Sequence, residues 1–272
     1  MDNKRFQLGH GRSSLSATAL PVVAAIACMA APAARAEGVL TAFSTAPGPQ
    51  APAPWRFTTL PNKAPTKFEI TQLDGQKVLK VDADKSYGNL VHATRVQLND
   101  QATLAWRWKV EEFVEGADLR TKGGDDGAAK ICVFFDFPSD RLSVGERTKL
   151  ALAKGSTGET VPTETLCYVW DVKESKGSEF DNAFTKRIRM DVIESGATDK
   201  AGGWLSERRT LMTDYKRAFG AEAGDTLPDV VGVAIQADAD NTKSRGISYF
   251  SDIDLRGVTA SAPASGAAKP AQ

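Results

Sequence analysis

The residues best suited to chemistry lie in a glycine-rich loop, "LRTKGGDDG", which precedes the apolar run "AAKICVFFDF". The loop brings Arg120, Lys122, Asp125 and Asp126 close together along the chain. Such side chains can hydrogen-bond sugar hydroxyls, and a carboxylate that faces a second one across a cleft can hydrolyse a glycosidic bond. We expect one aspartate to face a groove and the other to accept hydrogen bonds from loop amides. A solvated turn before a strand is the alternative.

A second acidic loop, "QADADNTKSRG", follows another apolar run. Asp238, Asp240 and Asn241 offer the kind of oxygen ligands that Ca²⁺ binds. The loop lacks the central glycine and the final glutamate of an EF-hand, so a structural calcium site competes with simple turn chemistry. No other cofactor is expected, because the sequence contains no phosphate loop, dinucleotide fingerprint or CxxC motif.

Aromatic residues of two predicted strands have the ring faces that stack on sugars. Trp106 and Trp108 share one face of "ATLAWRWKV", and Tyr168 and Trp170 share one face of "TLCYVWD". Large aromatics at this spacing are usual in a core, where we place Trp106 and Trp108. Trp170, which stands at a strand end beside Asp171, is our candidate for a ligand groove.

Strands must position these residues, because hydrophobic alternation with period two dominates the chain. The segments "KFEITQL" and "KVLKVDA" flank Asp74-Gly75, a hairpin dipeptide. The pattern predicts a mainly β protein, a two-layer antiparallel β-sandwich of jelly-roll type. We expect one sandwich domain at 55–258, after an extended proline-rich arm at 37–54 and before a disordered tail at 259–272.

Two helices are expected to interrupt the strands. Ser143 and Glu146 have capping-box spacing, which predicts a short helix at about 144–154. A long amphipathic helix is predicted at about 203–219, with Gly220 after its end. On a helical wheel Arg208 falls within the apolar stripe, so its guanidinium needs a buried carboxylate. We expect a structural clamp between Arg208 and one of four aspartates, Asp238, Asp240, Asp252 and Asp254.

The N-terminal region has the pattern of an export signal. Basic residues precede an apolar, alanine-rich segment that ends in Ala34-Arg35-Ala36, which predicts a signal peptide at 1–36. The protein is therefore expected to be periplasmic or secreted, with no membrane span in the mature chain. Lipidation of Cys28, which would anchor the protein to a membrane, is the alternative.

Export also limits the chemistry of the mature chain. Cys132 and Cys167 are the cysteines that remain, and an oxidising compartment permits a disulfide between them, with two buried thiols as the alternative. His92 is the remaining histidine, which excludes a multi-histidine metal centre. The 34 basic and 34 acidic residues balance, which argues against a nucleic-acid partner.

Several segments follow one another in a fixed order: "LAWRWKV", "GADLRTKGGDDGAAKICVFFDFP", "LCYVWD", "WLSERRTLMTDYKRAFG" and "VVGVAIQADADNTKSRGISYFSDI". Together they resemble the domain of unknown function 3047 family of exported bacterial proteins, which brings no established activity. The resemblance marks these motif positions: Trp106, Trp108, Asp125, Asp126, Tyr168, Trp170, Glu207, Arg208, Arg209, Tyr215, Asp240 and Asn241. Cys132 and Cys167 depart from the family pattern, so a disulfide would be particular to this protein.

Three functions are compatible with these residues. The first is a binding module for a glycan or other cell-envelope ligand, with five candidate contacts: Arg120, Lys122, Asp125, Asp126 and Trp170. The second is a carboxylate-based or metal-assisted hydrolase of a glycan or ester. The third is a scaffold or assembly protein without a small ligand. Binding is our first hypothesis, because it requires the fewest features that are not visible in the sequence. Whether the protein is an enzyme stays open.

Overall fold

The computed structural model describes residues 39–157, 161–196 and 203–261. The predicted signal peptide, Cys28 and most of the predicted tail lie outside these described residues. Thr259 and Ala260, at the start of the predicted tail, form a short strand, so the sandwich continues past 258. The proline-rich arm is anchored to the domain, because Phe43, in a short 3-10 helix (Phe43–Thr45), is fully buried.

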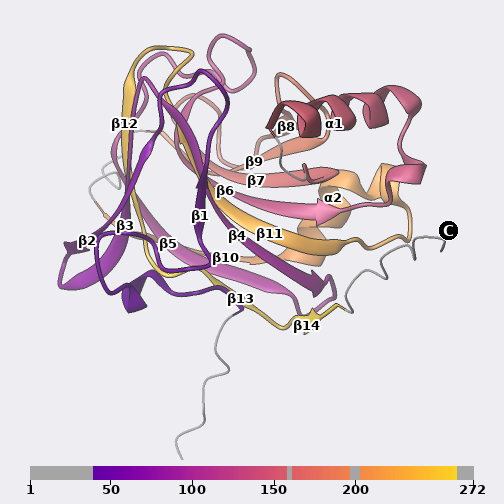
Figure 1. Ribbon diagram of the computed structural model, residues 1–272, viewed down its shortest axis with the longest axis horizontal. Helices are drawn as coiled ribbons and strands as arrows, with labels where there is room; N and C mark the ends of the chain where they lie inside the picture. Colours follow the sequence, from indigo (N-terminus) through magenta and orange to yellow (C-terminus); the bar gives the residue numbers. More distant parts are fainter. Residues whose placement is uncertain (1–38, 158–160, 197–202, 262–272) are drawn as a thin grey trace, which may run out of the picture. The chain divides into compact units, whose positions relative to one another are not determined.

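The strands form two sheets, as the period-two pattern predicts (Figure 1). The eight-stranded sheet has the order β1 (Arg56–Thr58), β4 (Tyr87–Gln97), β11 (Asp229–Asp238), β6 (Gly127–Asp136), β7 (Glu164–Asp171), β9 (Ile188–Ser195) and β8 (Glu179–Asp181), with β14 (Thr259–Ala260) beside β4. The six-stranded sheet has the order β10 (Leu205–Thr210), β5 (Thr103–Glu112), β12 (Arg245–Phe250), β3 (Gln76–Asp84) and β2 (Lys67–Leu73), with β13 (Asp254–Arg256) beside β5. Among these strands β7 and β9 pair in parallel, and the other pairs are antiparallel. The protein is a mainly β, two-layer sandwich.

The main core lies between the sheets and takes one face of each strand. On β5, Trp106 and Trp108 are buried in it, as predicted, while their neighbours are partly exposed. Strand β6 is buried on both faces: Ile131 belongs to the main core, and Cys132 to a second apolar cluster on the outer face of the eight-stranded sheet. That outer face is therefore also a packed surface, and the candidate site lies on it.

Helix α1 (Val144–Thr157) begins where its capping box predicts. A short 3-10 helix (Ser139–Arg141) leads into it from β6. Ser143 N donates to Glu146 Oε2 at 3.1 Å, and Glu146 N donates back to Ser143 Oγ at 3.3 Å. The two side chains thus satisfy amide groups that the first helical turn leaves without partners.

Helix α2 (Leu211–Ala223) differs from the predicted helix at 203–219. Leu205–Thr210 form strand β10 instead, paired with β5 so that Glu207 lies opposite Trp106. The backbone of these residues hydrogen-bonds to β5, whose edge would otherwise be exposed. This pairing outweighs the local helical preference of the segment. The helix then continues through Gly220 and ends at Gly224, whose φ is +59°.

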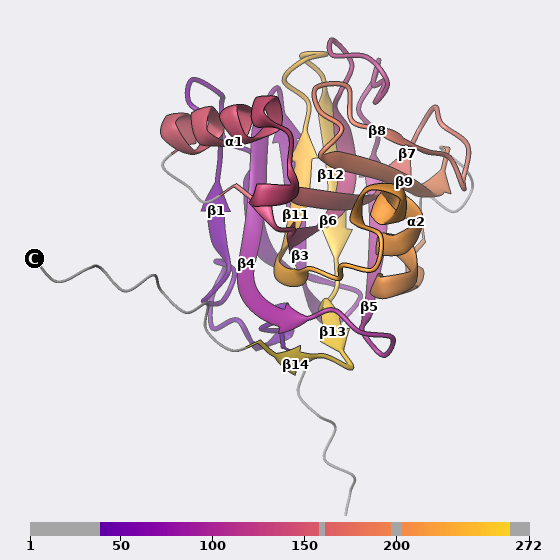
Figure 2. The ribbon, with the colours of Figure 1, turned by 90° about the vertical axis from the view of Figure 1, so that its right-hand side faces the viewer.

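The two helices lie at separate places on the domain. Figure 2 shows α1 and α2 on different sides of the domain. Helix α2 lies beside β9, as the contacts of Arg189 of β9 with Ala218 and Glu222 of α2 show. In the parts of the chain that the structure describes, no helix is long and apolar enough to cross a membrane.

Candidate functional site: a groove on the outer face of the eight-stranded sheet

A groove of about 1110 Å³ crosses the outer face of the eight-stranded sheet. Its floor comes from β4, β6, β7 and β11, because side chains alternate between the two faces of each strand. On β6, Ile131 and Val133 point into the main core, whereas Cys132 and Phe134 line the groove. The groove is at the upper end of the volumes of ligand sites, which are on the order of 300–1,000 Å³.

A disulfide lies in this floor. Cys132 of β6 stands directly opposite Cys167 of β7, with 4.0 Å between their Cα atoms, and the two sulfurs are bonded. This is one of the two alternatives that the sequence left open. The bond cross-links the central strands of the floor, beneath the place where a ligand would lie.

One wall of the groove comes from α1 and another from the segment between β8 and β9. Helix α1 contributes Glu146, Lys149 and Leu150. The β8–β9 segment contributes residues 181–188, including Phe184, whose side chain is 57% exposed. An exposed ring at the edge of a groove is available for stacking on a ligand.

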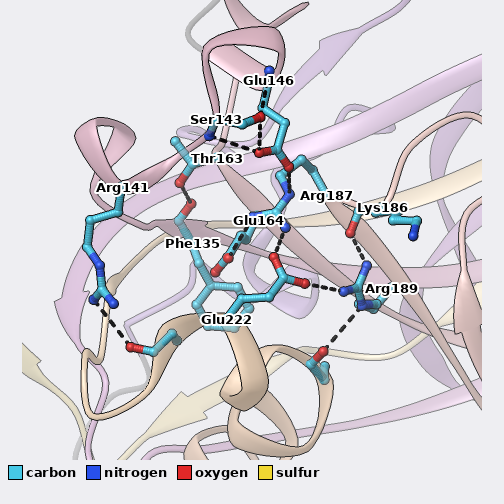
Figure 3. A network of polar contacts seen from close by, with 12 residues as sticks. Phe135, Arg141, Ser143, Glu146, Thr163, Glu164, Lys186, Arg187, Arg189 and Glu222 are labelled. Carbon is cyan, nitrogen blue, oxygen red and sulfur yellow. Dashed lines mark hydrogen bonds and ion pairs between the residues drawn. The ribbon is translucent and has the colours of Figure 1, made fainter.

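Arg187 fastens these walls to the sheets and to α2 (Figure 3). Its guanidinium lies 3.1 Å from Glu146 of α1 and 3.1 Å from Glu164 of β7, and it also contacts Glu222 of α2. Glu164 is fully buried, and this burial raises its pKa, although a 2.7 Å hydrogen bond from the Tyr215 hydroxyl acts in the opposite direction. Arg187 thus links the two walls of the groove to a buried carboxylate of β7 and to α2.

The carboxylates that line the groove are each held by an arginine. The hydrogen bonds from Ser143, with a smaller contribution from Arg187, keep the pKa of Glu146 below its usual value. The ion pairs are Asp136 with Arg95 at 2.6 Å, Glu146 with Arg187 at 3.1 Å and Asp181 with Arg189 at 2.8 Å. Glu146, whose pKa is lowered, is therefore a poor proton donor near neutral pH.

The glycine-rich loop supports the groove from outside and does not line it. Asn182 of the β8–β9 segment donates to Asp125 Oδ2 at 2.8 Å. The Lys122 ammonium lies 5.6 Å from the centre of the Phe184 ring. Arg120 pairs with Glu174 at 2.8 Å, on the surface. The predicted contacts Arg120, Lys122 and Asp125 therefore position a wall of the groove.

Asp126 joins the two acidic loops, which the sequence did not place together. It is fully buried and accepts hydrogen bonds from the backbone amides of Asn241 at 3.3 Å and Thr242 at 2.7 Å. The prediction that one aspartate faces a groove while the other binds loop amides is thus half right. Asp126 binds amides, but these belong to the other loop.

The predicted calcium ligands do not converge on one point. Asp238 is buried and accepts hydrogen bonds from Lys130 Nζ and Gly127 N, both at 2.9 Å. Burial raises the pKa of Asp238 to about 6, against the effect of Lys130. Asp240 pairs with Lys63, and Asn241 turns to Asp126. Within the described ranges no three acidic, histidine or cysteine side chains are placed to hold a metal ion, so these residues do not fit a calcium site.

The prediction that Trp170 lies in a groove is wrong. Its side chain is only 2% exposed, and its ring centre lies 5.7 Å from that of Trp108 and 5.9 Å from that of Phe113. Strand parity explains the error, because Trp170 shares the inner face of β7 with Tyr168 and packs against β5. The groove-facing residues of β7 are Thr165 and Cys167.

The predicted Arg208 clamp is also wrong, and the adjacent arginine takes this role. Arg208 is exposed on β10, whereas Arg209 points inward and binds Asp214 through two hydrogen bonds of 2.8 and 2.9 Å. A strand presents alternate residues to the core, so position 209 and not 208 faces inward. The proposed partners are engaged elsewhere: Asp238 with Lys130, and Asp252 with Ser44.

One further carboxyl pair lies outside the groove, between β9 and β10. Burial and the neighbouring Glu194 carboxyl raise the pKa of Glu207 to about 7. Lys176 Nζ lies 2.7 Å from Glu194 Oε1. Glu207 Oε1 is buried and has no hydrogen-bond partner among the described residues. The sequence indicated Glu207 only as a family-motif position.

The sequence singled out Cys132 and Cys167 of the groove floor as a possible disulfide, but it did not indicate that they line a groove. A signal was present, because "KICVFFDF" is apolar on both faces and implies that both faces of β6 are covered. Which side chains meet across the sheet depends on pairing. The register places Asn89 of β4 opposite Gln236 of β11, and both line the groove.

Two solved structures share parts of this architecture. Endoglucanase 3 from family GH12 of Trichoderma harzianum aligns with 77% of this chain and all of its own, at 10% identity and a TM-score of 0.36. A cellulose-induced protein, Cip1, aligns with 74% of this chain and 90% of its own, at 12% identity and a TM-score of 0.25. At these scores neither likeness bears on function.

No curated protein matches the sequence. The profile of one family, described as a protein of unknown function (DUF3047), matches residues 53–254. This range contains the two acidic loops, the groove strands and the Glu194–Glu207 pair. With most of its length matched, the chain belongs to the DUF3047 family.

Proposed function

We propose that this protein is an exported glycan-binding protein whose ligand lies in the groove of the eight-stranded sheet. The observation that supports this proposal is the groove itself, which is about 1110 Å³ in volume and is lined in part by aromatic, amide and hydroxyl side chains. Export is supported by the basic and apolar pattern of residues 1–36 and by the disulfide, a bond typical of oxidising compartments.

The lining suits a saccharide because it combines ring faces with neutral hydrogen-bonding groups. Tyr87, Phe134 and Phe184 offer aromatic surface, and Asn89 and Gln236 offer amides that both donate and accept. Sugar rings present an apolar face and a rim of hydroxyls, which need both kinds of partner. Asn89 Nδ2 already donates to the Tyr87 hydroxyl at 3.3 Å, which orients both groups at one end of the groove.

Binding is favoured over hydrolysis within the groove. Glycoside hydrolysis needs one carboxyl that can donate a proton and a second carboxylate across the bond. The acidic side chains that line the groove are ion-paired with arginines, so none of them is placed as a proton donor.

Carboxylate-based hydrolysis is the second candidate function, at a different place. The observation that favours it is Glu207, whose pKa of about 7 is suited to a general acid, beside Glu194. Glu207→Gln tests it: a hydrolase loses turnover while groove binding is unchanged. No turnover of any bound polysaccharide by the wild-type protein would remove this candidate.

Phe184→Ala tests the groove. Affinity for a bound polysaccharide, measured by isothermal titration calorimetry after a glycan-array screen, should fall about three- to tenfold, because one stacking surface is lost. Stability should stay unchanged, since the ring is 57% exposed.

Phe57→Ala is the matched control. Phe57 is a 42% exposed phenylalanine on β1 of the same sheet and does not line the groove. Equal losses for both variants, or a purified protein that binds no polysaccharide, would contradict the proposal and favour the scaffold alternative.

A further inference from the structure

We infer that the saccharide in this groove carries negative charge, so that its natural ligand is an acidic polysaccharide. This inference rests on the proposed function and adds the chemical class of the ligand. It follows from the charges around the groove and from the partners that those charges have.

Basic side chains outnumber acidic ones in the groove lining. Five cations line it: Arg56, Arg95, Lys149, Lys186 and Arg187. Three acids line it: Asp136, Glu146 and Asp181. Each of these acids already holds an arginine within 3.1 Å. The acids are thus neutralised within the protein, and positive charge remains.

Lys149 and Lys186 carry that remaining charge. Both side chains are exposed, and within the described part of the chain neither ammonium group forms an ion pair or hydrogen bond. Lys149 lies in α1 after Glu146, and Lys186 directly precedes Arg187. Glu146 and Arg187 are in contact, so each lysine follows or precedes, along the chain, a member of the ion pair that joins the two walls. Figure 3 shows Lys186 beside Arg187.

The distribution of charge favours an acidic sugar chain over a general polyanion. The whole chain has 34 basic and 34 acidic residues, so no broad positive field attracts nucleic acid. The same groove is also lined by Tyr87, Asn89 and Phe134, whose rings and amide suit sugar rings and hydroxyls. A polymer that alternates sugar rings with anionic groups matches both parts.

Two matched pairs of polymers test the inference with the purified protein. Polygalacturonate is compared with its methyl ester, and dextran sulfate with dextran. In low salt at least one anionic polymer should bind about tenfold more tightly than its neutral counterpart, and added salt should reduce this preference. The two pairs distinguish carboxylate from sulfate groups as the source of the charge.

A double variant, Lys149→Gln with Lys186→Gln, should weaken binding of the preferred anionic polymer about three- to tenfold and leave the neutral one unchanged. The control is Lys154→Gln with Lys216→Gln, which removes one exposed lysine of α1 and one of α2, neither of which lines the groove. Melting curves verify that each variant is folded.

The results separate this inference from the proposed function. Equal binding of anionic and neutral polymers, still sensitive to Phe184→Ala, would overturn the inference and leave the groove as a glycan site. A double variant that behaves like its control would also overturn it. Binding that is insensitive to every groove substitution would overturn both.

Discussion

Two clusters of acidic side chains lie between β9 and β10, and they differ in how their charge is balanced. In the first, Asp214 of α2 accepts hydrogen bonds from Arg209 at 2.8 Å, Arg217 at 2.7 Å and the Tyr168 hydroxyl at 2.8 Å. Asp191 of β9 lies 3.1 Å from Arg209 and also contacts Arg217. Arg217 also contacts Glu179 of β8, so three acids share two arginines, and each charge has a partner.

The second cluster lies farther along the same strands and lacks such balance. Among the described residues, the cation paired with Glu194 of β9 is Lys176, which is 62% exposed, and no ion pair holds Glu207 of β10. Burial, followed by the Glu194 carboxyl, raises the pKa of Glu207 to about 7. One of these carboxyls therefore keeps a proton into the neutral range.

The comparison shows that the number of nearby cations, and not the strand backbone, determines whether a buried carboxyl group is ion-paired or keeps its proton. Arg209 and Arg217 pair with the acids of the first cluster. In the second cluster, burial and the Glu194 carboxyl favour the protonated form of Glu207. The contact between β9 and β10 is therefore ion-paired at the first cluster and sensitive to pH at the second.

Asp214→Asn should have the largest effect, because it removes one acidic partner from each of two partly buried guanidinium groups, those of Arg209 and Arg217. We expect the free energy of unfolding to fall by about 3 kcal/mol, measured by urea denaturation at pH 7. Asp225→Asn, an exposed aspartate just after the same helix, is the control and should change stability little. A loss below about 0.5 kcal/mol would show that this cluster does not fasten the domain.

Arg209→Ala and Arg208→Ala, compared directly, should separate the inward arginine from the outward one. Arg209→Ala should cost about 2 kcal/mol, because Asp214 and Asp191 are buried and lose a shared partner. Arg208→Ala should stay within about 0.5 kcal/mol, as expected for an exposed side chain. Equal effects would contradict the assigned strand parity.

Glu207→Gln should have the smallest effect, and one that depends on pH. The folded protein holds this proton more tightly than the unfolded chain, so the carboxyl lowers stability as pH rises from about 4.5 to about 7. The uncharged amide should therefore stabilise the protein at pH 8, by about 1 kcal/mol since the side chain is only half buried, and have little effect at pH 4.

Melting temperatures of both proteins between pH 4 and pH 8 measure this difference. Asp225→Asn, measured in parallel, controls for the change of an exposed carboxylate to an amide. A Glu207→Gln curve that runs parallel to that of the wild type would mean that Glu207 titrates normally, and the second cluster would then resemble an ordinary surface pair.

Much of the fold could be predicted from local patterns. Period-two alternation identified the sandwich, and the spacing of Ser143 and Glu146 identified the start of α1, because a capping box involves residues that are close in sequence. The segment 203–210 could not be assigned in this way. Its apolar residues do not distinguish the period of a helix from that of a strand. Only pairing with the open edge of β5 makes this segment a strand.

The site was less predictable for the same physical reason. Asp125 and Asp126 were recognised as unusual, but their partners Asn182 and Asn241 come from distant segments. Trp170 and Arg208 were assigned to the wrong surfaces, because successive residues of a strand point to opposite faces of the sheet. The groove exists only after four strands are aligned, so no short segment of sequence encodes it.

The parallel pairing of β7 and β9 has a consequence for how this family can diversify. A parallel neighbour requires the chain to return to the starting end of β7, and the return path, residues 172–187, carries β8 and Phe184. Insertions or deletions in this path would reshape the rim over the disulfide floor while leaving the two-sheet core intact. Selectivity can therefore evolve there independently of folding, and the same path is the natural place to engineer a new ligand preference.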